Sequence, residues 1–160
     1  MSMMLGAGVM GKSAHNHDGG GVNYLCLPLD PEFRSDAQEG HQRHAYVYGV
    51  EYEAGFPGLG NHDAPCAVCE VEGRSAVLMI AAKRTCPAGW TKEYEGLLAA
   101  QHHNQKGSTF VCVSSGMESR AGGNENRDGG LLYVVEAQCG SLPCGPYTNG
   151  FEITCVVCTK

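Results

Sequence analysis

Short apolar runs, separated by glycine, proline, asparagine and aspartate, set the pattern of this chain. The runs are rich in valine, leucine and tyrosine, and their lengths suit β-strands better than helices. The run 76–80 is continuously apolar, which is typical of a strand buried on both faces. We predict strands at 22–27, 46–53, 76–80, 109–113, 131–137 and 151–157.

Helix signals are weak by comparison. The best candidate is the segment 93–103, and it contains Gly96, which disfavours a helix interior. Turn-forming residues at 56–58, 122–124 and 128–130 lie between the apolar runs. Many short strands joined by such turns predict an all-β fold with little helix.

The chain also contains an internal repeat. Its two Cys-x-x-Cys pairs, at 66–69 and 155–158, are 89 residues apart, and Cys26 precedes Cys112 by 86 residues. A nearly constant offset is the mark of a duplication. We predict two homologous half-domains that form one compact unit, residues 1–75 and 76–160.

Composition narrows the range of partners. The chain has 160 residues and a net charge of −6, and its basic residues form no cluster. Its electrostatic potential is therefore unfavourable for binding a nucleic acid or an anionic membrane. No apolar run approaches the ~20 residues of a membrane span. Although 23 residues are glycine, the Gly-x-y repeat of a collagen triple helix is missing. We therefore expect no nucleic-acid partner and no membrane span.

Nine cysteines are many for a chain of this size. Reduced cytosolic proteins rarely carry so many unless they bind metal, so we predict a secreted, disulfide-bonded protein. The segment 1–10 is apolar, but it has neither the basic start nor the clear cleavage site of a signal peptide. Either a leader has been removed or the protein is not exported by that route.

Metal and redox chemistry are alternatives for the Cys-x-x-Cys pairs. Structural zinc sites use two such pairs, usually ~15–20 residues apart, whereas these lie far apart and enclose only alanine and valine. A thioredoxin-like pair needs a helix N-terminus, and neither pair opens a helix-like segment. Cysteines three apart on a strand face opposite sides, so we expect the members of each pair to bond to different partners.

The two halves differ in their cysteine count. The second half has six cysteines, which allow fifteen pairings, and the turn-like segment between Cys139 and Cys144 makes a local bond plausible. The first half has only three, because a counterpart of Cys86 would lie before Met1. One first-half cysteine therefore lacks a partner, which indicates a free thiol, an intermolecular bond or a truncated chain.

Five motifs are spread over almost the whole chain: NYLCLP at 23–28, PCAVC at 65–69, CPAGW at 86–90, CGSLPC at 139–144 and TCVVCTK at 154–160. Together they resemble the C-terminal noncollagenous domain of spongin short-chain collagen-related proteins, a family related to the C-terminal domain of type IV collagen. The resemblance implies a β-rich pair of subdomains that trimerises extracellular matrix chains. The chain departs from the family pattern in starting inside the first half and in lacking a collagenous segment.

The resemblance also implies a disulfide pairing and a set of partners. Cys69 is left over, either unpaired or intermolecular. The expected partners are further copies of the chain, with a trimer favoured, or other matrix chains. The implied bonds are Cys86–Cys158, Cys112–Cys155, Cys139–Cys144 and Cys26–Cys66.

Four histidines fall at matching places in the two halves. They could form a metal site or a pH switch. A polar turn before a strand is the interpretation we favour, so we predict no metal and no cofactor. The residues are His15, His17, His102 and His103.

No catalytic set stands out. The chain lacks the motifs of serine hydrolases, phosphate-binding loops and zinc proteases. Ser114, Ser115 and Ser119 have no paired base in the sequence. The repeat-equivalent Glu51 and Glu136 are more typical of a solvated strand face or an ion pair than of a catalytic acid pair. We predict that the protein is not an enzyme.

The expected function is therefore extracellular assembly: a secreted structural module of the matrix. The alternative is a secreted glycan-binding protein of the lectin type, because loop residues have side chains of the kinds that bind sugars. Trp90 is expected to pack in the core beside Cys86 rather than to bind a ligand. The glycan-binding candidates are Tyr147, Asn149, Trp90 and Asn124.

Overall fold

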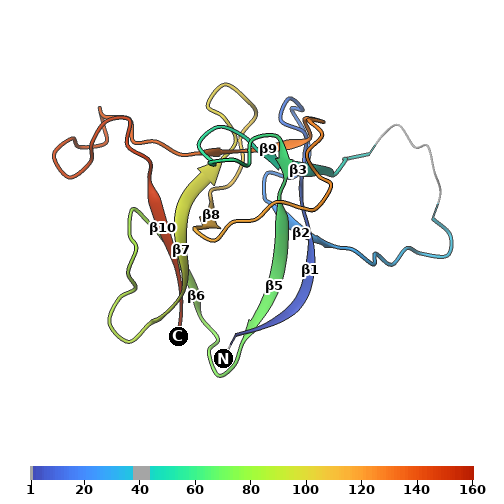
Figure 1. The fold of residues 1–160 in the computed structure, drawn as a ribbon, viewed down its shortest axis with the longest axis horizontal. Coiled ribbons are helices and arrows are strands. Elements are labelled where there is room, and N and C mark those ends of the chain that lie inside the picture. The colour runs from blue at the N-terminus through green and yellow to red at the C-terminus, as the bar shows by residue number, and fades with distance from the viewer. Residues whose placement is uncertain (1, 38–43) are drawn as a thin grey trace.

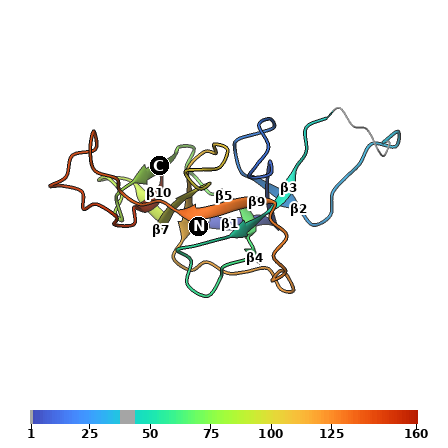
Figure 2. The same cartoon turned by 90° about the horizontal axis from the view of Figure 1, so that it is seen from above.

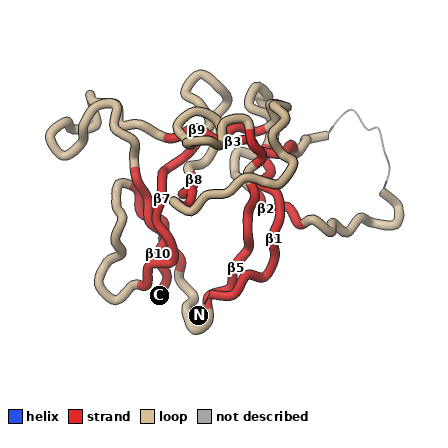
Figure 3. The backbone as a smooth tube through the Cα atoms, in the orientation of Figure 1, coloured by secondary structure: helices blue, strands red, loops and turns tan. Residues whose placement is uncertain are grey.

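The computed structural model describes residues 2–37 and 44–160, and within these residues it contains strands and no helix. The predicted all-β class is confirmed. Figure 3 shows the strands (red) joined by long loops (tan). The strands are β1 (Ser2–Lys12), β2 (Leu25–Pro28), β3 (Tyr48–Tyr52), β4 (His62–Asp63), β5 (Pro65–Val71), β6 (Val77–Ala81), β7 (Thr91–Ala100), β8 (Val111–Ser114), β9 (Gly130–Val134) and β10 (Thr154–Thr159).

The strands form one curled sheet in the order β2-β1-β3-β9-β7-β10-β6, with β4 beside β3, β5 beside β1 and β8 beside β7. Every ladder is antiparallel except the one between β3 and β9. Figure 1 shows two arms that meet at β3 and β9, with a chain terminus near the free end of each. We call β1, β2 and β5 the first arm, and β6, β7, β8 and β10 the second arm. Seen from above in Figure 2, the β9–β10 loop (red) projects at one end, opposite the loop that follows β2.

The two arms repeat one pairing scheme. In the first half, β1 pairs with β2, β3 and β5, and in the second half β7 pairs with β8, β9 and β10. The register repeats as well, because Tyr48 of β3 lies opposite Lys12 and Tyr133 of β9 lies opposite Ala100. A duplication predicts this repetition, although the common origin of the halves stays a prediction.

Two glycines allow the strands of each arm to close over one another. A Cβ atom at Gly8 of β1 would collide with the carbonyl oxygen of Leu27, and one at Gly96 of β7 would collide with that of Val113. The two carbonyl groups belong to β2 and β8, the matching strands of the two arms. The missing side chains therefore let β2 and β8 approach the central strand of their arm closely.

The core lies where the two arms meet. Its larger cluster contains Val50 and Tyr52 from β3, Leu132 from β9 and Ala99 from β7, so both halves contribute to it. The parallel ladder between β3 and β9 crosses this cluster and joins the halves. A smaller buried cluster in the second arm consists of Leu98, Cys112 and Cys155.

The best helix candidate, the segment 93–103, is not a helix. Its residues 93–100 belong to β7, which pairs with β8, β9 and β10. Gly96, which counted against a helix, lies where β7 is approached by the β8 backbone. The long strand β1 was not predicted, because its glycine, alanine and methionine residues have weak strand propensity.

The prediction of a buried strand at 76–80 is wrong in its burial. A strand is present there as β6, but four of its five residues are exposed. The physical reason is its position at the sheet edge, where β10 is its only neighbour among the described strands. Trp90 is only half-buried and lies outside both core clusters, contrary to expectation.

Within the described residues, no helix is long and apolar enough to span a bilayer.

Candidate functional site

Four disulfides are present, and two of them join strands within an arm. Cys26 of β2 bonds to Cys66 of β5, and Cys112 of β8 bonds to Cys155 of β10, so matching strands are joined in the two arms. These are pairs that the family resemblance implies. The remaining two, also as the resemblance implies, are Cys86–Cys158 and Cys139–Cys144.

Cys69 is the free cysteine of the described chain, and its side chain is exposed on β5. It lies opposite Met4 in the β1–β5 ladder, four residues from Gly8 along β1. Cys158 lies opposite Lys92, which is four residues from Gly96 along β7, and it is fully buried in its disulfide. Cys69 is therefore the positional equivalent of a bonded cysteine, without the bond.

Tyr94 on β7 is a partly exposed tyrosine of the second arm. Burial raises the pKa of Tyr94, and the charge of Cys69 raises it further. The Tyr94 hydroxyl donates a hydrogen bond to the Cys112 carbonyl oxygen at 3.2 Å, which holds the ring against β8.

Exposed apolar side chains gather on the outer strands of both arms. On β5, four consecutive residues from Ala67 to Glu70 are exposed, so neither face of the strand is covered there. β5 and β6 each have one strand neighbour among the described residues. We call β5, β6 and the start of β1 the outer strands; among the described strands, the start of β1 pairs only with β5. Their large exposed apolar residues are Met3, Met4 and Leu5 of β1, Val68 of β5, and Val77, Leu78 and Met79 of β6.

The four histidines singled out by the repeat do not form a common cluster. His15 lies in the turn after β1, where its Nδ1 contacts the Gly129 carbonyl oxygen at 3.2 Å. His17 packs edge-on against Tyr48. His102 and His103 stack on each other, with ring centroids 4.1 Å apart.

Three carboxylates instead gather where β3 meets the start of β9. One carboxylate oxygen from each of Glu51, Glu53 and Asp128 lies within 4.8 Å of the other two. Among the described residues, these three side chains are the group that is close enough together to share a metal ion. Burial raises the pKa of Glu53, and the charges of Asp128 and Glu51 raise it further, while His15 opposes the shift.

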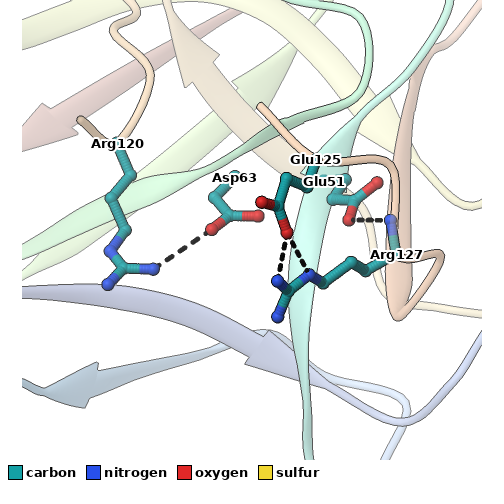
Figure 4. Close-up of polar contacts among 5 residues, drawn as sticks. All are labelled: Glu51, Asp63, Arg120, Glu125 and Arg127. Atoms are coloured by element: carbon teal, nitrogen blue, oxygen red, sulfur yellow. Dashed lines mark hydrogen bonds and ion pairs between the residues drawn. The ribbon is translucent and has the colours of Figure 1, made fainter. Parts of the chain in front are cut away.

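Glu51 is the buried member of this cluster, only 3% exposed. One carboxylate oxygen accepts a hydrogen bond from the Arg127 backbone N–H at 2.8 Å, as Figure 4 shows. The other oxygen, Oε2, is buried without a hydrogen-bond partner. A buried carboxylate oxygen without a partner is costly, because it has lost its hydration.

Arginines border the cluster but are engaged with other acids. Arg120 bonds to Asp63 at 3.2 Å, and the Arg127 guanidinium bonds to Glu125 (Figure 4). The hydrogen bond with Glu125 is the main cause of the raised pKa of Arg127, and the charge of Glu125 raises it further. These side chains line a small polar hollow of about 200 Å³. No ion pair joins either arginine to Glu53 or Asp128 in the described residues.

Lys12 of β1, opposite Tyr48 of β3, is a buried basic residue. It is 2% exposed, and its Nζ donates a hydrogen bond to the Ser13 carbonyl oxygen at a long 3.5 Å. Burial lowers the pKa of this amine. Ala100 takes the equivalent place in the second half, so this charge is specific to the first half.

The glycan-binding candidates lie in different loops. Trp90 precedes β7, Asn124 belongs to the β8–β9 connection, and Tyr147 and Asn149 lie between β9 and β10. Among the described residues, no hydrogen bond or ring contact joins these four. Asn149 instead accepts a hydrogen bond from the Cys139 backbone N–H at 2.9 Å.

A larger open hollow lies elsewhere, with a volume of about 540 Å³. Its walls include Asn16, His17 and Asp18 from the turn after β1 and Tyr46 from the segment before β3. Half of the Tyr46 side chain is exposed there. Sequence reasoning did not identify this hollow, because its walls are far apart in the chain.

The residues considered for catalysis remain unpaired with a base. The Ser115 hydroxyl donates to the Glu95 carbonyl oxygen at 3.0 Å, and Ser114 accepts from the Gly116 backbone N–H at 3.2 Å. Glu136 is exposed and forms a bridge with Glu152, whereas Glu51 is buried in the carboxylate cluster. That no enzyme activity exists stays a prediction.

The carboxylate cluster is the feature that sequence reasoning missed. Glu51 and Glu53 are two residues apart on a strand and so share one face, which is a signal that the sequence contains. Asp128 comes from a turn 75 residues further on, where it has a left-handed backbone with φ of 50°. Only the parallel pairing of β3 with β9 brings it to the two glutamates.

Comparison of the chain with protein-family models, with curated proteins and with solved structures gave no match.

Proposed function

We propose that this protein is an extracellular assembly module that associates with further copies of itself through the outer strands of its two arms. The observation that carries the proposal is the exposed apolar surface on β1, β5 and β6. Large exposed apolar patches mark interaction surfaces, and a strand edge offers unpaired backbone groups to a partner strand. The family resemblance implies the same role and favours a trimer.

The charge distribution supports association of identical chains. β6 has the sequence VLMIA and contains no charge, and β1 carries no acidic residue. Contacts between copies through β6 or β1 therefore bring no acidic residues of these strands together, despite the net charge of −6, while β5 adds one exposed acidic residue, Glu70. Four disulfides are compatible with an extracellular, oxidising environment.

Cys69 adds a possible covalent link to this surface. It is exposed on β5, next to Val68 and opposite Met4, and so lies inside the proposed contact area. Association of two copies through β5 would bring their thiols near each other. A bond between copies would then give the exposed thiol a covalent partner.

The test is the mass of the assembly in solution, measured by sedimentation velocity. We expect the native protein to sediment as an oligomer, and Val68→Asp combined with Val77→Asp to sediment as a monomer with an unchanged melting temperature. Both residues are at least half exposed, so the charges should not harm the fold of one chain. Phe33→Asp is the matched control, because Phe33 is 80% exposed on the loop after β2, away from the outer strands.

A monomeric native protein at micromolar concentration would contradict the proposal. So would an oligomer that the double variant leaves intact while Phe33→Asp disrupts it.

Glycan binding is a second candidate, favoured by the hollow of about 540 Å³ beside Tyr46. An exposed tyrosine ring offers an apolar face and a hydroxyl, and Asn16 and Asp18 supply polar groups at the same place. Titration calorimetry with a panel of saccharides tests it, with Tyr46→Ala as the variant. We expect Tyr46→Ala to abolish any saccharide heat, and saccharide binding that Tyr46→Ala leaves unchanged would contradict this site.

A further inference from the structure

We propose that Glu51, Glu53 and Asp128 bind a calcium ion that joins the two halves of the molecule. This site is independent of the proposed assembly, because none of its residues lies on the outer strands. Glu51 and Glu53 come from the first half, at and just after the end of β3, and Asp128 comes from the second half, two residues before β9.

The spacing of the carboxylates fits a calcium ion. Ca²⁺ binds oxygen ligands at about 2.3–2.6 Å, so two oxygens on opposite sides of one ion are separated by roughly 4.6–5.2 Å. The three carboxylate oxygens lie within 4.8 Å of one another, so a single ion can contact all three. Two oxygens that bind the ion at an angle smaller than 180° lie closer together than this.

The unpartnered oxygen of Glu51 is an independent indication. Glu51 is buried, and while its first oxygen is held by the Arg127 backbone N–H, Oε2 has no partner. Buried polar atoms are nearly always satisfied, and each exception calls for an explanation such as an ion. A cation in the cluster supplies the missing partner.

The charge balance points the same way. Three carboxylates at this separation repel one another, and this repulsion together with burial raises the pKa of Glu53. The nearest arginine, Arg127, pairs with Glu125 instead. A divalent cation offsets the repulsion that no side-chain cation in the described residues relieves by direct contact.

The turn that carries Asp128 is already held in place. The Arg127 backbone N–H donates to Glu51, and the Gly129 carbonyl oxygen accepts a hydrogen bond from the His15 backbone N–H at 3.0 Å. The flanking residues thus fix the turn against both β3 and the end of β1. The site is largely preorganised, so an ion does not have to order a loose loop in order to bind.

The experiment measures calcium binding to the full, disulfide-bonded chain by titration calorimetry, and terbium binding by luminescence. Tb³⁺ replaces Ca²⁺ and is excited through nearby tyrosine. Tyr133 is suitable, because burial and then the charge of Glu53 raise its pKa, which places the ring near the cluster. We expect one ion per chain and a dissociation constant of about 10⁻⁴–10⁻³ M, as in extracellular calcium modules.

The variants separate an ion site from a structural role. Glu53→Gln and Asp128→Asn should each weaken calcium binding at least ~10-fold and abolish the calcium-dependent rise in melting temperature. Asparagine tolerates the left-handed backbone at position 128, so Asp128→Asn preserves the turn. Glu136→Gln is the matched control: Glu136 corresponds to Glu51 in the second half and lies outside the cluster, so its loss should leave binding unchanged.

Two results would overturn the site. One is the absence of calcium heat and of terbium luminescence up to about 10 mM ion. The other is binding that Glu53→Gln and Asp128→Asn leave at the native affinity. Neither result depends on whether the chain is a monomer or an oligomer.

Discussion

The two arms have the same strand pairing but very different burial. In the second arm, β10 lies between β7 and β6, and its Cys155, Val156 and Cys158 are fully buried. In the first arm, β5 has β1 as its described strand neighbour, and the central residues of β5 are exposed. The comparison shows that the local sequence motif sets the pairing, whereas a third strand decides whether the paired residues become core.

The cysteines follow the same division. Each arm has one disulfide between the two strands that flank its central strand, Cys26–Cys66 across β1 or Cys112–Cys155 across β7. The second arm has in addition Cys86–Cys158, while the equivalent Cys69 of the first arm is free. The second arm therefore has a disulfide at the position where the first arm has a free, exposed thiol.

The largest expected difference between the arms comes from removing the additional disulfide of the second arm, Cys86–Cys158. Cys86→Ser removes a disulfide that spans 72 residues, and the chain-entropy estimate for such a loop is about 4 kcal/mol of unfolding free energy. Cys69→Ser removes an exposed thiol and should leave unfolding within about 0.5 kcal/mol of the native value. Denaturant titration of the two variants measures both. Comparable losses of stability would refute the different roles assigned to Cys86 and Cys69.

The matched glycines test whether the arms share one packing solution. Gly8→Ala and Gly96→Ala each place a Cβ against a backbone carbonyl, and we expect losses of about 1–3 kcal/mol in both arms. Gly6→Ala is the control, because nothing lies within 4 Å of a Cβ at that position of β1. Thermal unfolding of the three variants decides. A tolerated Gly8→Ala beside a disruptive Gly96→Ala would mean that the arms are packed differently.

The smallest expected effect concerns the charge that only the first half buries. Since burial lowers the pKa of Lys12, the unfolded chain holds this proton more tightly than the folded chain. The resulting penalty is present at neutral pH, shrinks as the pH rises through the lowered pKa, and is gone above the ordinary value of 10.5.

Lys12→Met should therefore stabilise the fold at pH 7 by at most about 1 kcal/mol, because solvent screens part of the charge. The gain should fade towards pH 10.5. Denaturant unfolding at several pH values measures it, with the exposed Lys83→Met as control. A stabilisation that does not change with pH would show that packing, and not charge, is the cause.

Much of the fold could be predicted from patterns that lie close together in the sequence. The apolar runs predicted the existence of β2, β3, β6, β8, β9 and β10, although their ends differ by a few residues. The Cys-x-x-Cys fillers predicted strand structure in β5 and opposite-facing cysteines, and Cys155 and Cys158 indeed bond to different partners. Which strands lie next to each other, in contrast, could not be predicted from the sequence. This is why the prediction that β6 is buried was wrong.

The carboxylate site was out of reach for the same reason. Glu51 and Glu53 were visible as residues of one strand face, but Asp128 joins them only through the parallel β3–β9 ladder. A parallel register between distant segments leaves no local mark in the sequence. The hollow beside Tyr46 also depends on tertiary contacts, between the turn after β1 and the segment before β3.

The disulfides have a consequence for covalent connectivity. All four join residues within one half, and none bridges the turn between β5 and β6. A single cut in that turn would therefore leave two fragments that are held together by noncovalent contacts, chiefly the shared core, the β3–β9 ladder and polar contacts such as that of Arg120 with Asp63. After such a cut, the two fragments would form a noncovalent heterodimer, and each fragment would retain its own disulfides. The two halves are therefore suited to reassembly as a split protein.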